Sequence, residues 1–406
     1  MRILIITAGS RGDVAPFTGL GRRLLDAGHE VTVAAHPSFA TLVGGCGLGH
    51  HPVPGDPREL IRSWSRAASR DEARALTRAY VDGLADGVAT AVADGTDLVL
   101  TAHAPALLSR TGGEALGVPV IETHLVPAFA TGEFPLPGAP GGEDLGPQGN
   151  LAAGRAVLSR RDQLFADAVI RLRARLGLPA GAPATPVGDD RPVFAGFSPL
   201  VLPRPTDWPS RVEVTGYWWP PRPDGWRPPA ELVDFLQAGP PPVFIGFGSM
   251  APGQGERLGE LVSAAVKRAG VRAVVQAGWA ELSGGGDDDV LTIGDVPHDW
   301  LFPRTAAVVH HAGAGTTGAG LRAGVPAVPV PVLADQPFWA ARLHRLGVAP
   351  RILPFQDLGA EALGAAITMC VTEPAHRRRA AELARRIASE DGAAAVLAHV
   401  ASEADR

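Results

Sequence analysis

Short apolar runs alternate along the chain with stretches whose apolar residues recur at helical spacing. The run Ile3–Thr7 ends at a glycine-rich turn, Asp13–Ala27 has helical spacing, and Glu30–Ala35 is again strand-like. This β–α–β order is the unit from which parallel α/β sheets are built. Further strand-like runs lie at 98–101, 118–122, 243–247, 273–276, 308–311 and 325–332, and helical stretches at about 70–93, 151–176, 256–269, 317–323 and 375–400. The pattern predicts an α/β protein with doubly wound parallel sheets.

A proline-rich segment, WWPPRPDGWRPP at 218–229, interrupts this pattern. Proline cannot continue a helix or a central strand, and a new helix-then-strand series begins at Ala230. We therefore predict two domains, a linker and a final helix, with the bounds 1–215 for the first domain, 216–238 for the linker, 239–383 for the second domain and 384–406 for the C-terminal helix.

A second irregular stretch, Thr131–Asn150, contains four prolines among many glycines. A loop of this length inside a domain is uncommon and often functional. Two interpretations stay open: a lid near a ligand, or a surface insertion without a role.

Composition and charge exclude several classes of protein. The 37 basic and 42 acidic residues give a net charge of −5 without a basic run, which argues against nucleic-acid binding. Lys267 is the only lysine, so no Walker-A motif exists. Cys46 and Cys370 form neither a disulfide framework nor a zinc-binding CxxC pair. No apolar run reaches the roughly 18–20 residues that span a bilayer. We expect a soluble, cytoplasmic monomer or homodimer.

The segment Val308–Gln336 carries the clearest candidate chemistry. A strand ends at His310-His311, a turn of small residues follows, and a helix begins near Thr316. Backbone N–H groups at a helix N-terminus bind anions, and Gly313 and Gly315 allow these amides to approach a ligand closely. The segment therefore predicts a phosphate-binding turn.

The glycines of this turn also spell G-x-G-x-x-G at Gly313, Gly315 and Gly318, and Asp335 follows after another strand. This arrangement is typical of dinucleotide binding, so an NAD-dependent oxidoreductase is an alternative function. Two observations weigh against it: two β-units precede the turn, whereas the fingerprint normally opens its domain, and NAD binding does not require the histidine pair. A nucleotide-binding module without catalysis is a further alternative.

The segment at 296–340 reads VPHDWLFPRTAAVVHHAGAGTTGAGLRAGVPAVPVPVLADQPFWA. It resembles the donor-binding signature of the UDP-glycosyltransferase superfamily, whose members are inverting GT-B enzymes, and is similar above all to the sterol 3-β-glucosyltransferase-like branch with its bacterial natural-product members. Four shorter segments support the resemblance in the same order, namely GSRGDVAPF at 9–17, FSPLVLPRPTDWP at 197–209, VTGYWW at 214–219 and PPVFIGFGSM at 241–250.

The resemblance implies a GT-B fold, in which two Rossmann-like domains face each other across a cleft. The second domain would bind the nucleotide sugar, and the first would bind the acceptor. The final helix would pack back on the first domain.

The resemblance also implies roles for donor-side residues. The diphosphate would be bound by six residues, His311, Gly313, Gly315, Thr316, Thr317 and Ser249. Asp335 and Gln336 would contact sugar hydroxyls, which favours a fully hydroxylated hexose over a deoxysugar, although Asp335 is also placed to cap a helix. Trp279 and Val296 would contact the nucleobase or the ribose. The chain departs from plant members at Asp295 and Ala319, where those carry a stacking tryptophan and a ribose-binding glutamate.

On the acceptor side, Asp13 matches the family's general base, which takes the proton of the attacking hydroxyl. Asp13 is also well placed to cap the helix that contains Pro16. Four further candidates for acceptor binding rest on their location, namely His124, Trp64, Phe129 and Phe134. For His124 the alternative is a hydrogen-bonded histidine at a strand end. The string Asp287–Asp289 is expected to be a solvated loop, and we expect no metal site.

The sequence thus predicts an inverting, metal-independent glycosyltransferase without a resident cofactor. The first hypothesis is transfer of glucose from UDP-glucose to a hydroxyl of an apolar acceptor such as a sterol. The alternative within the class is a tailoring enzyme that glycosylates a polyketide or macrolide-type aglycone with a dTDP-deoxysugar.

Overall fold

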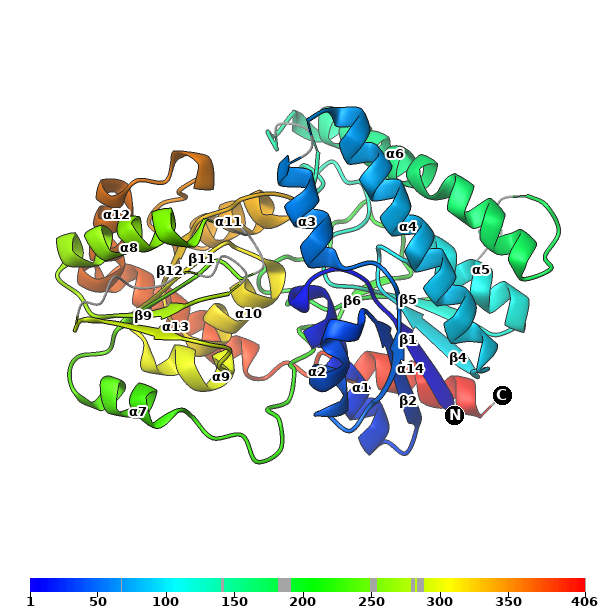
Figure 1. Ribbon diagram of the computed structural model, residues 1–406, viewed down its shortest axis with the longest axis horizontal. Helices are drawn as coiled ribbons and strands as arrows, with labels where there is room; N and C mark the ends of the chain where they lie inside the picture. Colours follow the sequence, from blue (N-terminus) through cyan, green and yellow to red (C-terminus); the bar gives the residue numbers. More distant parts are fainter. Residues whose placement is uncertain are drawn as a thin grey trace. The chain divides into compact units, whose positions relative to one another are not determined.

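The computed structural model describes residues 1–66, 68–139, 142–181, 191–248, 254–278, 282 and 288–405, which form two compact units (Figure 1). The first unit comprises Met1–Pro199, Pro203–Asp224 and Asp391–Arg406, and the second comprises Leu200–Leu202 and Gly225–Glu390. The change of unit after Asp224 falls within the proline-rich segment.

The first unit is built on a seven-stranded sheet whose strands pair in parallel, in the order β3-β2-β1-β4-β5-β6-β7. The strands are β1 Arg2–Ile6, β2 Glu30–Ala35, β3 Gly49–Pro52, β4 Leu98–Thr101, β5 Val120–His124, β6 Val193–Ala195 and β7 Val212–Val214. The helices are α1 Arg11–Asp26, α2 Ala40–Gly44, α3 Pro57–Arg66, α4 Arg70–Ala93, α5 Ala106–Leu116, α6 Gly146–Arg175 and α14 Ala394–Ala404, with a 3-10 turn at Pro37–Phe39.

Helices cover both faces of this sheet, which is why its central strands are apolar throughout. Helices α1 and α14 contribute buried side chains to the core on one face, and α4 and α6 contribute to the core on the other. The residues concerned are Val14, Phe17, Leu20 and Leu24 of α1, Val396 and Val400 of α14, Val81, Leu84 and Val88 of α4, and Phe165 and Val169 of α6. A sheet buried on both faces requires strands such as RILII in β1, where four consecutive residues are buried.

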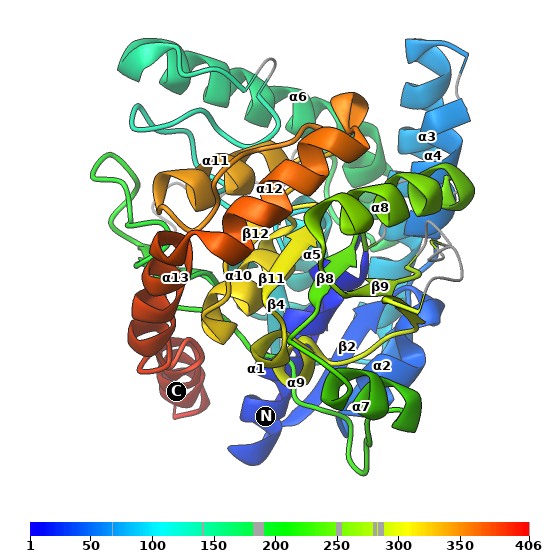
Figure 2. The ribbon, with the colours of Figure 1, turned by 90° about the vertical axis from the view of Figure 1, so that its left-hand side faces the viewer.

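The second unit holds a five-stranded parallel sheet in the order β10-β9-β8-β11-β12. The strands are β8 Val243–Gly246, β9 Ala273–Gln276, β10 Val290–Ile293, β11 Ala307–His310 and β12 Ala327–Pro329. The helices are α7 Ala230–Gln237, α8 Gly255–Ala269, α9 His298–Leu301, α10 Ala314–Ala323, α11 Gln336–Arg345, α12 Ala360–Thr372 and α13 Pro374–Ile387, with 3-10 turns at Phe302–Arg304 and Phe355–Asp357. Helices α8 and α12 pack together on one face of the sheet, and α9 and α13 lie on the other (Figures 1 and 2).

The predicted α/β class is therefore confirmed, with two parallel sheets that follow the Rossmann strand order. The apolar runs predicted the central strands well. They did not predict the short strands β3, β6, β7 and β10, because three or four residues with little alternation carry no strand signal. None of the described helices has the length and apolarity needed to cross a membrane.

The prediction of a single C-terminal helix over 375–400 is wrong, because the chain forms two helices there, α13 and α14. Between them Asp391 accepts two hydrogen bonds from the Arg23 guanidinium, at 2.9 and 3.0 Å. Gly392 lies against backbone, and a Cβ on it would stand 2.5 Å from the carbonyl oxygens of Gly216 and Tyr217. The indole of Trp218 donates to the Gly392 carbonyl at 2.8 Å. These contacts require a break in the helix, after which α14 joins the core of the first unit.

The irregular stretch 131–150 is attached to the first unit in its described part. Asp207 accepts hydrogen bonds from the Thr131 hydroxyl at 2.6 Å and from the Gly132 N–H at 2.7 Å. Glu133 accepts from the Thr206 N–H at 2.7 Å. These anchors fix the beginning of the stretch against 206–207.

We predict that Gly392→Ala lowers the free energy of unfolding by about 2 kcal/mol, because the added methyl group cannot fit against the two carbonyl oxygens. Urea denaturation followed by circular dichroism measures the effect. Gly44→Ala is the matched control, since Gly44 is helical and a Cβ there meets no atom within 4 Å. Equal stability of Gly392→Ala and the wild type would contradict the close packing described here.

Candidate functional site

Each sheet has one position where neighbouring strands lead off in opposite directions, and ligands bind there, outside the carboxyl ends of the strands. In the second unit this position lies between β8 and β11, and in the first unit between β1 and β4. The turn after β11 holds His311, and the turn after β1 leads to Asp13. The predicted donor-binding turn and the predicted general base therefore each follow a strand beside such a position.

The turn after β11 presents a helix N-terminus. Gly313 is the N-cap of α10, and the first helical hydrogen bond of the turn runs from the Thr317 N–H to the Gly313 carbonyl at 2.9 Å. The N–H groups of the preceding residues have no intrahelical acceptor, so Gly315 and Thr316 present donors there. Ala312 holds a left-handed conformation at φ 61°, which is strained for a residue with a Cβ. Such strain is typical of ligand-binding turns.

His311 packs closely against glycines on both sides. A Cβ on Gly248 would lie 2.8 Å from its ring, and a Cβ on Gly313 would lie 2.5 Å from its Nε2. Burial, together with the nearby His298, lowers the pKa of His311 to about 4, so the ring is neutral at pH 7. Within the described part of the chain, its Nδ1 has no hydrogen-bond partner.

Thr317 presents a second polar atom without a described partner. Its side chain is 1% exposed, and its Oγ1 makes no hydrogen bond to any residue that the structure describes. Burying a hydroxyl without a partner is unfavourable, so such a group points to a ligand or to a role in function. Together, His311 Nδ1, Thr317 Oγ1 and the free amides of α10 form a group of hydrogen-bonding atoms suited to an anion.

The two adjacent histidines have different environments. His310 is fully buried, and its Nδ1 accepts a hydrogen bond of 3.1 Å from the N–H of Ala312. Burial lowers the pKa of His310 to about 3, so it is neutral and its lone pair holds the strained turn in place. His310 thus supports the turn through its Nδ1, while its Nε2, like the Nδ1 of His311, has no partner among the described residues. His311 is the histidine that belongs to the turn itself.

Asp335 and Gln336 stand at the start of α11, where the sequence places the sugar contacts. Asp335 occupies the N-cap position without a side-chain capping bond, and it accepts a hydrogen bond of 2.8 Å from the Trp339 indole. The amide oxygen of Gln336 accepts from the N–H groups of Val332 and Leu333 at 2.8 and 3.1 Å. Both side chains therefore fix their own loop, and the NH2 group of Gln336 is the part left to reach a ligand.

Two of the predicted donor-side residues, Ser249 and Trp279, lie outside the described residues. Val296 is 7% exposed, so its main chain rather than its side chain could meet a base edge. Nearby, the Gln276 amide donates to Asp295 at 3.2 Å, which fixes the carboxyl ends of β9 and β10 relative to each other.

Asp13 lies at the start of α1 and is half-buried. Its Oδ2 accepts from the Ser10 N–H at 2.7 Å and from the Ser10 hydroxyl at 3.1 Å, which is the capping arrangement considered from the sequence. Gly9 has φ 126°, and a Cβ there would lie 2.3 Å from the same oxygen. Burial raises the pKa of Asp13, and the two bonds from Ser10 lower it less. Capping thus engages one oxygen and leaves Oδ1 available for proton transfer.

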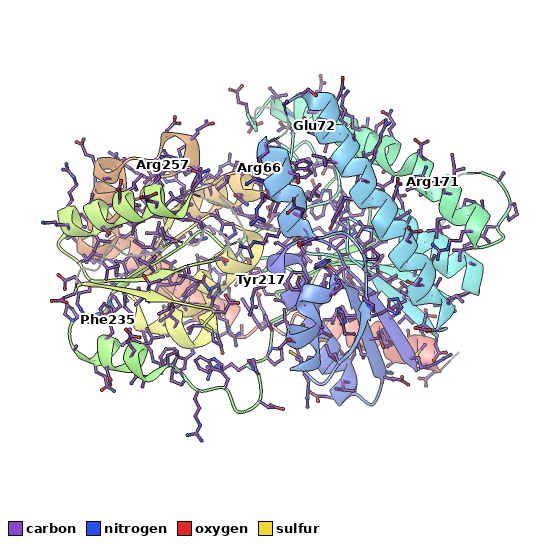
Figure 3. The ribbon with its side chains drawn as sticks, in the orientation of Figure 1. Arg66, Glu72, Arg171, Tyr217, Phe235 and Arg257 are labelled. Atoms are coloured by element: carbon purple, nitrogen blue, oxygen red, sulfur yellow. The ribbon has the colours of Figure 1, made fainter. Side chains whose placement is uncertain are left out.

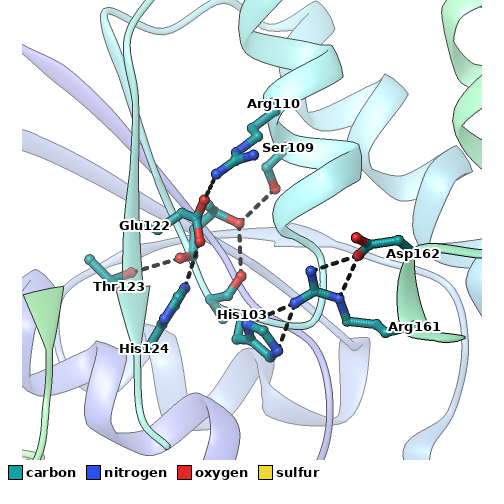
Figure 4. Close-up of polar contacts among 10 residues, drawn as sticks. His103, Ser109, Arg110, Glu122, Thr123, His124, Arg161 and Asp162 are labelled. Atoms are coloured by element: carbon teal, nitrogen blue, oxygen red, sulfur yellow. Dashed lines mark hydrogen bonds and ion pairs between the residues drawn. The ribbon is translucent and has the colours of Figure 1, made fainter. Parts of the chain in front are cut away.

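His124 is at the end of β5 and is 2% exposed. Its Nε2 lies 2.7 Å from Glu122, whose other oxygen pairs with Arg110 of α5 (Figure 4). Its ring lies 5.0 Å from that of His103, which follows β4 and contacts Arg161 of α6. His103, Glu122 and Arg110 are not among the residues predicted from the sequence. No local pattern joins them, since their partners come from separate strands and helices.

Phe129 and Phe134 belong to an aromatic group around Trp208. The rings of Phe129 and Phe134 lie 5.9 and 6.3 Å from that of Trp208, and the indole donates to the Phe129 carbonyl at 3.1 Å. Phe129 also lies 5.8 Å from His124, so three of the four acceptor-side candidates belong to one cluster or adjoin it.

Trp64 lies elsewhere, on α3, and its side chain is 39% exposed. Figure 3 shows the end of this helix, at the label of Arg66, beside α4. With Leu164, Thr77, Ala73 and Arg74 it lines a shallow cavity of about 230 Å³ between α3, α4 and α6. Trp64 is therefore not part of the aromatic group. Among the described residues, no three histidine, cysteine or acidic side chains are grouped to hold a metal ion.

Comparison with known proteins gives two family matches. Residues 3–135 match the Glycosyltransferase family 28 N-terminal domain, and residues 270–402 match the Erythromycin biosynthesis protein CIII-like, C-terminal domain. A relative from Streptomyces fradiae, O-mycaminosyltylonolide 6-deoxyallosyltransferase, is 40% identical over 97% of this chain and 95% of its own length.

A second relative is a sterol 3-beta-glucosyltransferase from Arabidopsis thaliana, which is 33% identical over 97% of this chain. The chain spans 64% of that relative's length. Among solved structures, the glycosyltransferase of kitacinnamycin matches with a TM-score of 0.73 and 22% identity, over 99% of this chain and 98% of the other. The structural likeness supports the GT-B fold class that the sequence predicts.

Replacing the buried hydroxyl of Thr317 by a methyl group tests whether it lacks a partner. We predict that Thr317→Val raises the free energy of unfolding of the ligand-free protein by about 1 kcal/mol, because a buried unpaired hydroxyl is removed without a change of shape. Urea denaturation measures this, with Thr368→Val as the control, since that hydroxyl donates to the Gly364 carbonyl at 2.9 Å. A loss of stability in Thr317→Val larger than in the control would contradict an unpaired hydroxyl.

Proposed function

The chain belongs to the glycosyltransferases that combine a family 28 N-terminal domain with an EryCIII-like C-terminal domain, and from this premise we propose that it transfers a hexose, with inversion, from a nucleoside diphosphate sugar to a hydroxyl of an apolar acceptor. The observation that carries the proposal is the group of unpaired polar atoms at the start of α10. His311 Nδ1 and Thr317 Oγ1 stand beside a helix N-terminus and have no described protein partner.

On the donor side, this group binds the diphosphate in our proposal. Charge on the β-phosphate grows as the bond from the anomeric carbon to the phosphate oxygen breaks. Donors fixed in advance at this position stabilise the transition state more than the bound substrate. The amides of Gly315 and Thr316 and the dipole of α10 supply positive potential, so the proposed reaction needs no metal ion. By resemblance Ser249 contacts the phosphates.

Asp13 is the proposed general base. As the acceptor oxygen attacks the anomeric carbon, its proton passes to the Asp13 carboxylate and the nucleoside diphosphate leaves with the bonding electrons. A solvated aspartate with a pKa near 4 is a weak base, and the raised pKa of a half-buried carboxylate makes it a stronger one. The bonds from Ser10 to Oδ2 keep the side chain in one orientation during this transfer.

The sugar and the base are assigned by resemblance. We propose that Asp335 and Gln336 contact the sugar, and that Trp279 and the main chain of Val296 contact the nucleobase. The side-chain carbonyl oxygen of Gln336 accepts a hydrogen bond from the Val332 N–H, and one carboxylate oxygen of Asp335 accepts one from the Trp339 indole. The two side chains therefore have fewer atoms available for sugar hydroxyls than the sequence alone suggests. This observation removes much of the argument against a deoxysugar donor.

For the acceptor, we favour a macrolactone-type aglycone, glycosylated from a dTDP-deoxysugar. The supporting observation is the relative named O-mycaminosyltylonolide 6-deoxyallosyltransferase, which aligns over nearly its full length. The second candidate is a sterol glycosylated from UDP-glucose, supported by the plant relative. Phe129, Phe134 and His124 are proposed to line the acceptor site, and Trp64 to contribute to its apolar part.

A matrix of two donors and two acceptors tests the proposed function. The protein is incubated with a dTDP-6-deoxyhexose or UDP-glucose, and with O-mycaminosyltylonolide or cholesterol, and deoxyhexose or hexose mass shifts are recorded by mass spectrometry. We expect a sugar adduct in at least one combination, and saturable binding of UDP or dTDP in titrations. Binding of NAD without a response to either nucleotide would contradict the proposal.

We predict that Asp13→Asn lowers kcat by about 10²–10⁴-fold, because asparagine cannot take a proton. Its amide oxygen can still accept the bonds from Ser10, so stability and nucleotide affinity should stay close to those of the wild type. Steady-state kinetics and nucleotide titration measure both quantities. Unchanged turnover would assign the base elsewhere.

The pH dependence follows from the same carboxylate. The base acts in its deprotonated form, so activity falls as the pH drops through its pKa. Because burial raises the pKa of Asp13, the acid limb of kcat/KM is expected above the value of a solvated aspartate, ~4. A limb at or below that value would contradict desolvation of this group.

A further inference from the structure

The network at the ends of β4 and β5 contains a histidine whose tautomer is fixed. Glu122 of β5 is 9% exposed and shares its two oxygens between Arg110 and His124 (Figure 4). A carboxylate held by a guanidinium only accepts hydrogen bonds, so the His124 Nε2 at 2.7 Å must carry a proton. In the neutral ring, Nδ1 then carries the lone pair.

The surrounding charges keep this ring neutral. Burial has the largest effect, and the positive charges of Arg161, Arg110 and Arg211 add to it. Together they lower the pKa of His124 to about 3. His124 paired with Glu122 has the appearance of a base activated by a carboxylate. A ring with so low a proton affinity cannot serve as the general base at neutral pH, and Asp13 retains that role.

The Nδ1 atom of His124 is an acceptor without a partner in the described part of the chain. The His124 ring makes a T-shaped contact with the ring of His103, with centroids 5.0 Å apart, and lies 5.8 Å from the ring of Phe129. The unprotonated ring nitrogen of the neutral His103 accepts a hydrogen bond from the Arg161 guanidinium, and among the described residues His103 and His124 interact through their rings. The protein does not fully enclose this nitrogen, so a donor from outside the protein can reach it beside the aromatic group.

We propose that His124 Nδ1 accepts a hydrogen bond from a second, non-reacting hydroxyl of the acceptor, and that the acceptor is therefore polyhydroxylated. The inference rests on the proposed function. The reacting hydroxyl has one proton, and Asp13 takes it, so the hydroxyl at His124 is a different one. Strand β4 separates β1 from β5, so the strand ends leading to Asp13 and His124 are roughly 10 Å apart. The two hydroxyls are thus distant from each other on one acceptor.

This geometry selects between the two candidate acceptor classes. Cholesterol carries a single hydroxyl and has nothing left to donate to His124 once that hydroxyl reacts. A macrolactone such as O-mycaminosyltylonolide carries several hydroxyls around its ring. His124 is therefore a positioning residue for the polyhydroxylated class.

The tautomer is tested first, without any substrate. Nitrogen-15 NMR of histidine-labelled protein reads the protonation of each ring nitrogen, and His124→Gln identifies the signals by their loss. We expect Nε2 protonated and Nδ1 unprotonated, without titration down to pH 5. A proton on Nδ1, or a charged ring at pH 7, would overturn the inference.

Two substitutions then distinguish the role of Nδ1 from that of Nε2. His124→Gln keeps a donor toward Glu122 and loses the acceptor at Nδ1, whereas His124→Asn keeps an acceptor at that position and loses the link to Glu122. For O-mycaminosyltylonolide we expect KM about tenfold higher in His124→Gln and within about twofold of wild type in His124→Asn. Donor affinity and the acid limb of the pH profile should not move, and the KM for cholesterol should be unaffected. His376→Gln, on α13 of the second unit, is the matched control.

The possible results separate the inference from the proposed function. An unchanged KM in His124→Gln, an equal rise in both variants, or a wild-type protein that glycosylates cholesterol and not the macrolactone would overturn the inference while transfer itself stands. A wild-type protein that glycosylates neither acceptor with either donor would overturn the proposed function.

Discussion

The close contact between His311 and the glycines beside it is the constraint on which the candidate donor site depends. Gly248 and Gly313 leave no room for a Cβ, and Gly248 also has a positive φ, so both positions need glycine for steric reasons. The imidazole is thereby held closely between them and kept neutral beside the free end of α10. The buried His310 accepts a hydrogen bond from the N–H of Ala312 and thereby fixes the turn. The result is a set of polar atoms held in place before a ligand arrives, which is the arrangement that electrostatic stabilisation requires.

In the first unit, two carboxylates near the ends of β1 and β5 have different environments and hence different chemistry. Burial of Asp13 raises its pKa more than its hydrogen bonds, those from Ser10 first, lower it, so this carboxylate is suited to proton transfer. Glu122 is paired with Arg110, and it determines which nitrogen of His124 carries the proton. One carboxylate is thus suited to accept a proton, and the other to hold a hydrogen-bond acceptor in a fixed orientation. The division follows from the charges around each group rather than from the residue type.

The structure also changes the balance between the two hypotheses for the donor sugar, glucose and a deoxysugar. From the sequence, Asp335 and Gln336 favoured a fully hydroxylated hexose and hence glucose. In the structure, Asp335 accepts the Trp339 indole and Gln336 accepts two backbone amides, so these polar groups partly serve the loop itself. The relative that aligns over nearly its whole length is named as a deoxysugar transferase. The specificity of a site depends on the polar atoms that are not already engaged in hydrogen bonds within the protein.

The sequence by itself determined the fold class, the two-unit organisation and the turn after β11, because all three are encoded in local patterns: apolar runs, a proline cluster, and glycines and threonines at the start of a helix. The tertiary structure decided the environments of individual residues, which depend on contacts between segments far apart in the sequence. His310 and His311 are adjacent in the chain, and only packing assigns one to the interior and the other to the turn. The break before α14 depends on Gly392 meeting backbone from 216–217, far away in the sequence. The group of His103, Glu122 and Arg110 leaves no local signal, because its members come from separate strands and helices and interact only once the parallel sheet aligns their ends.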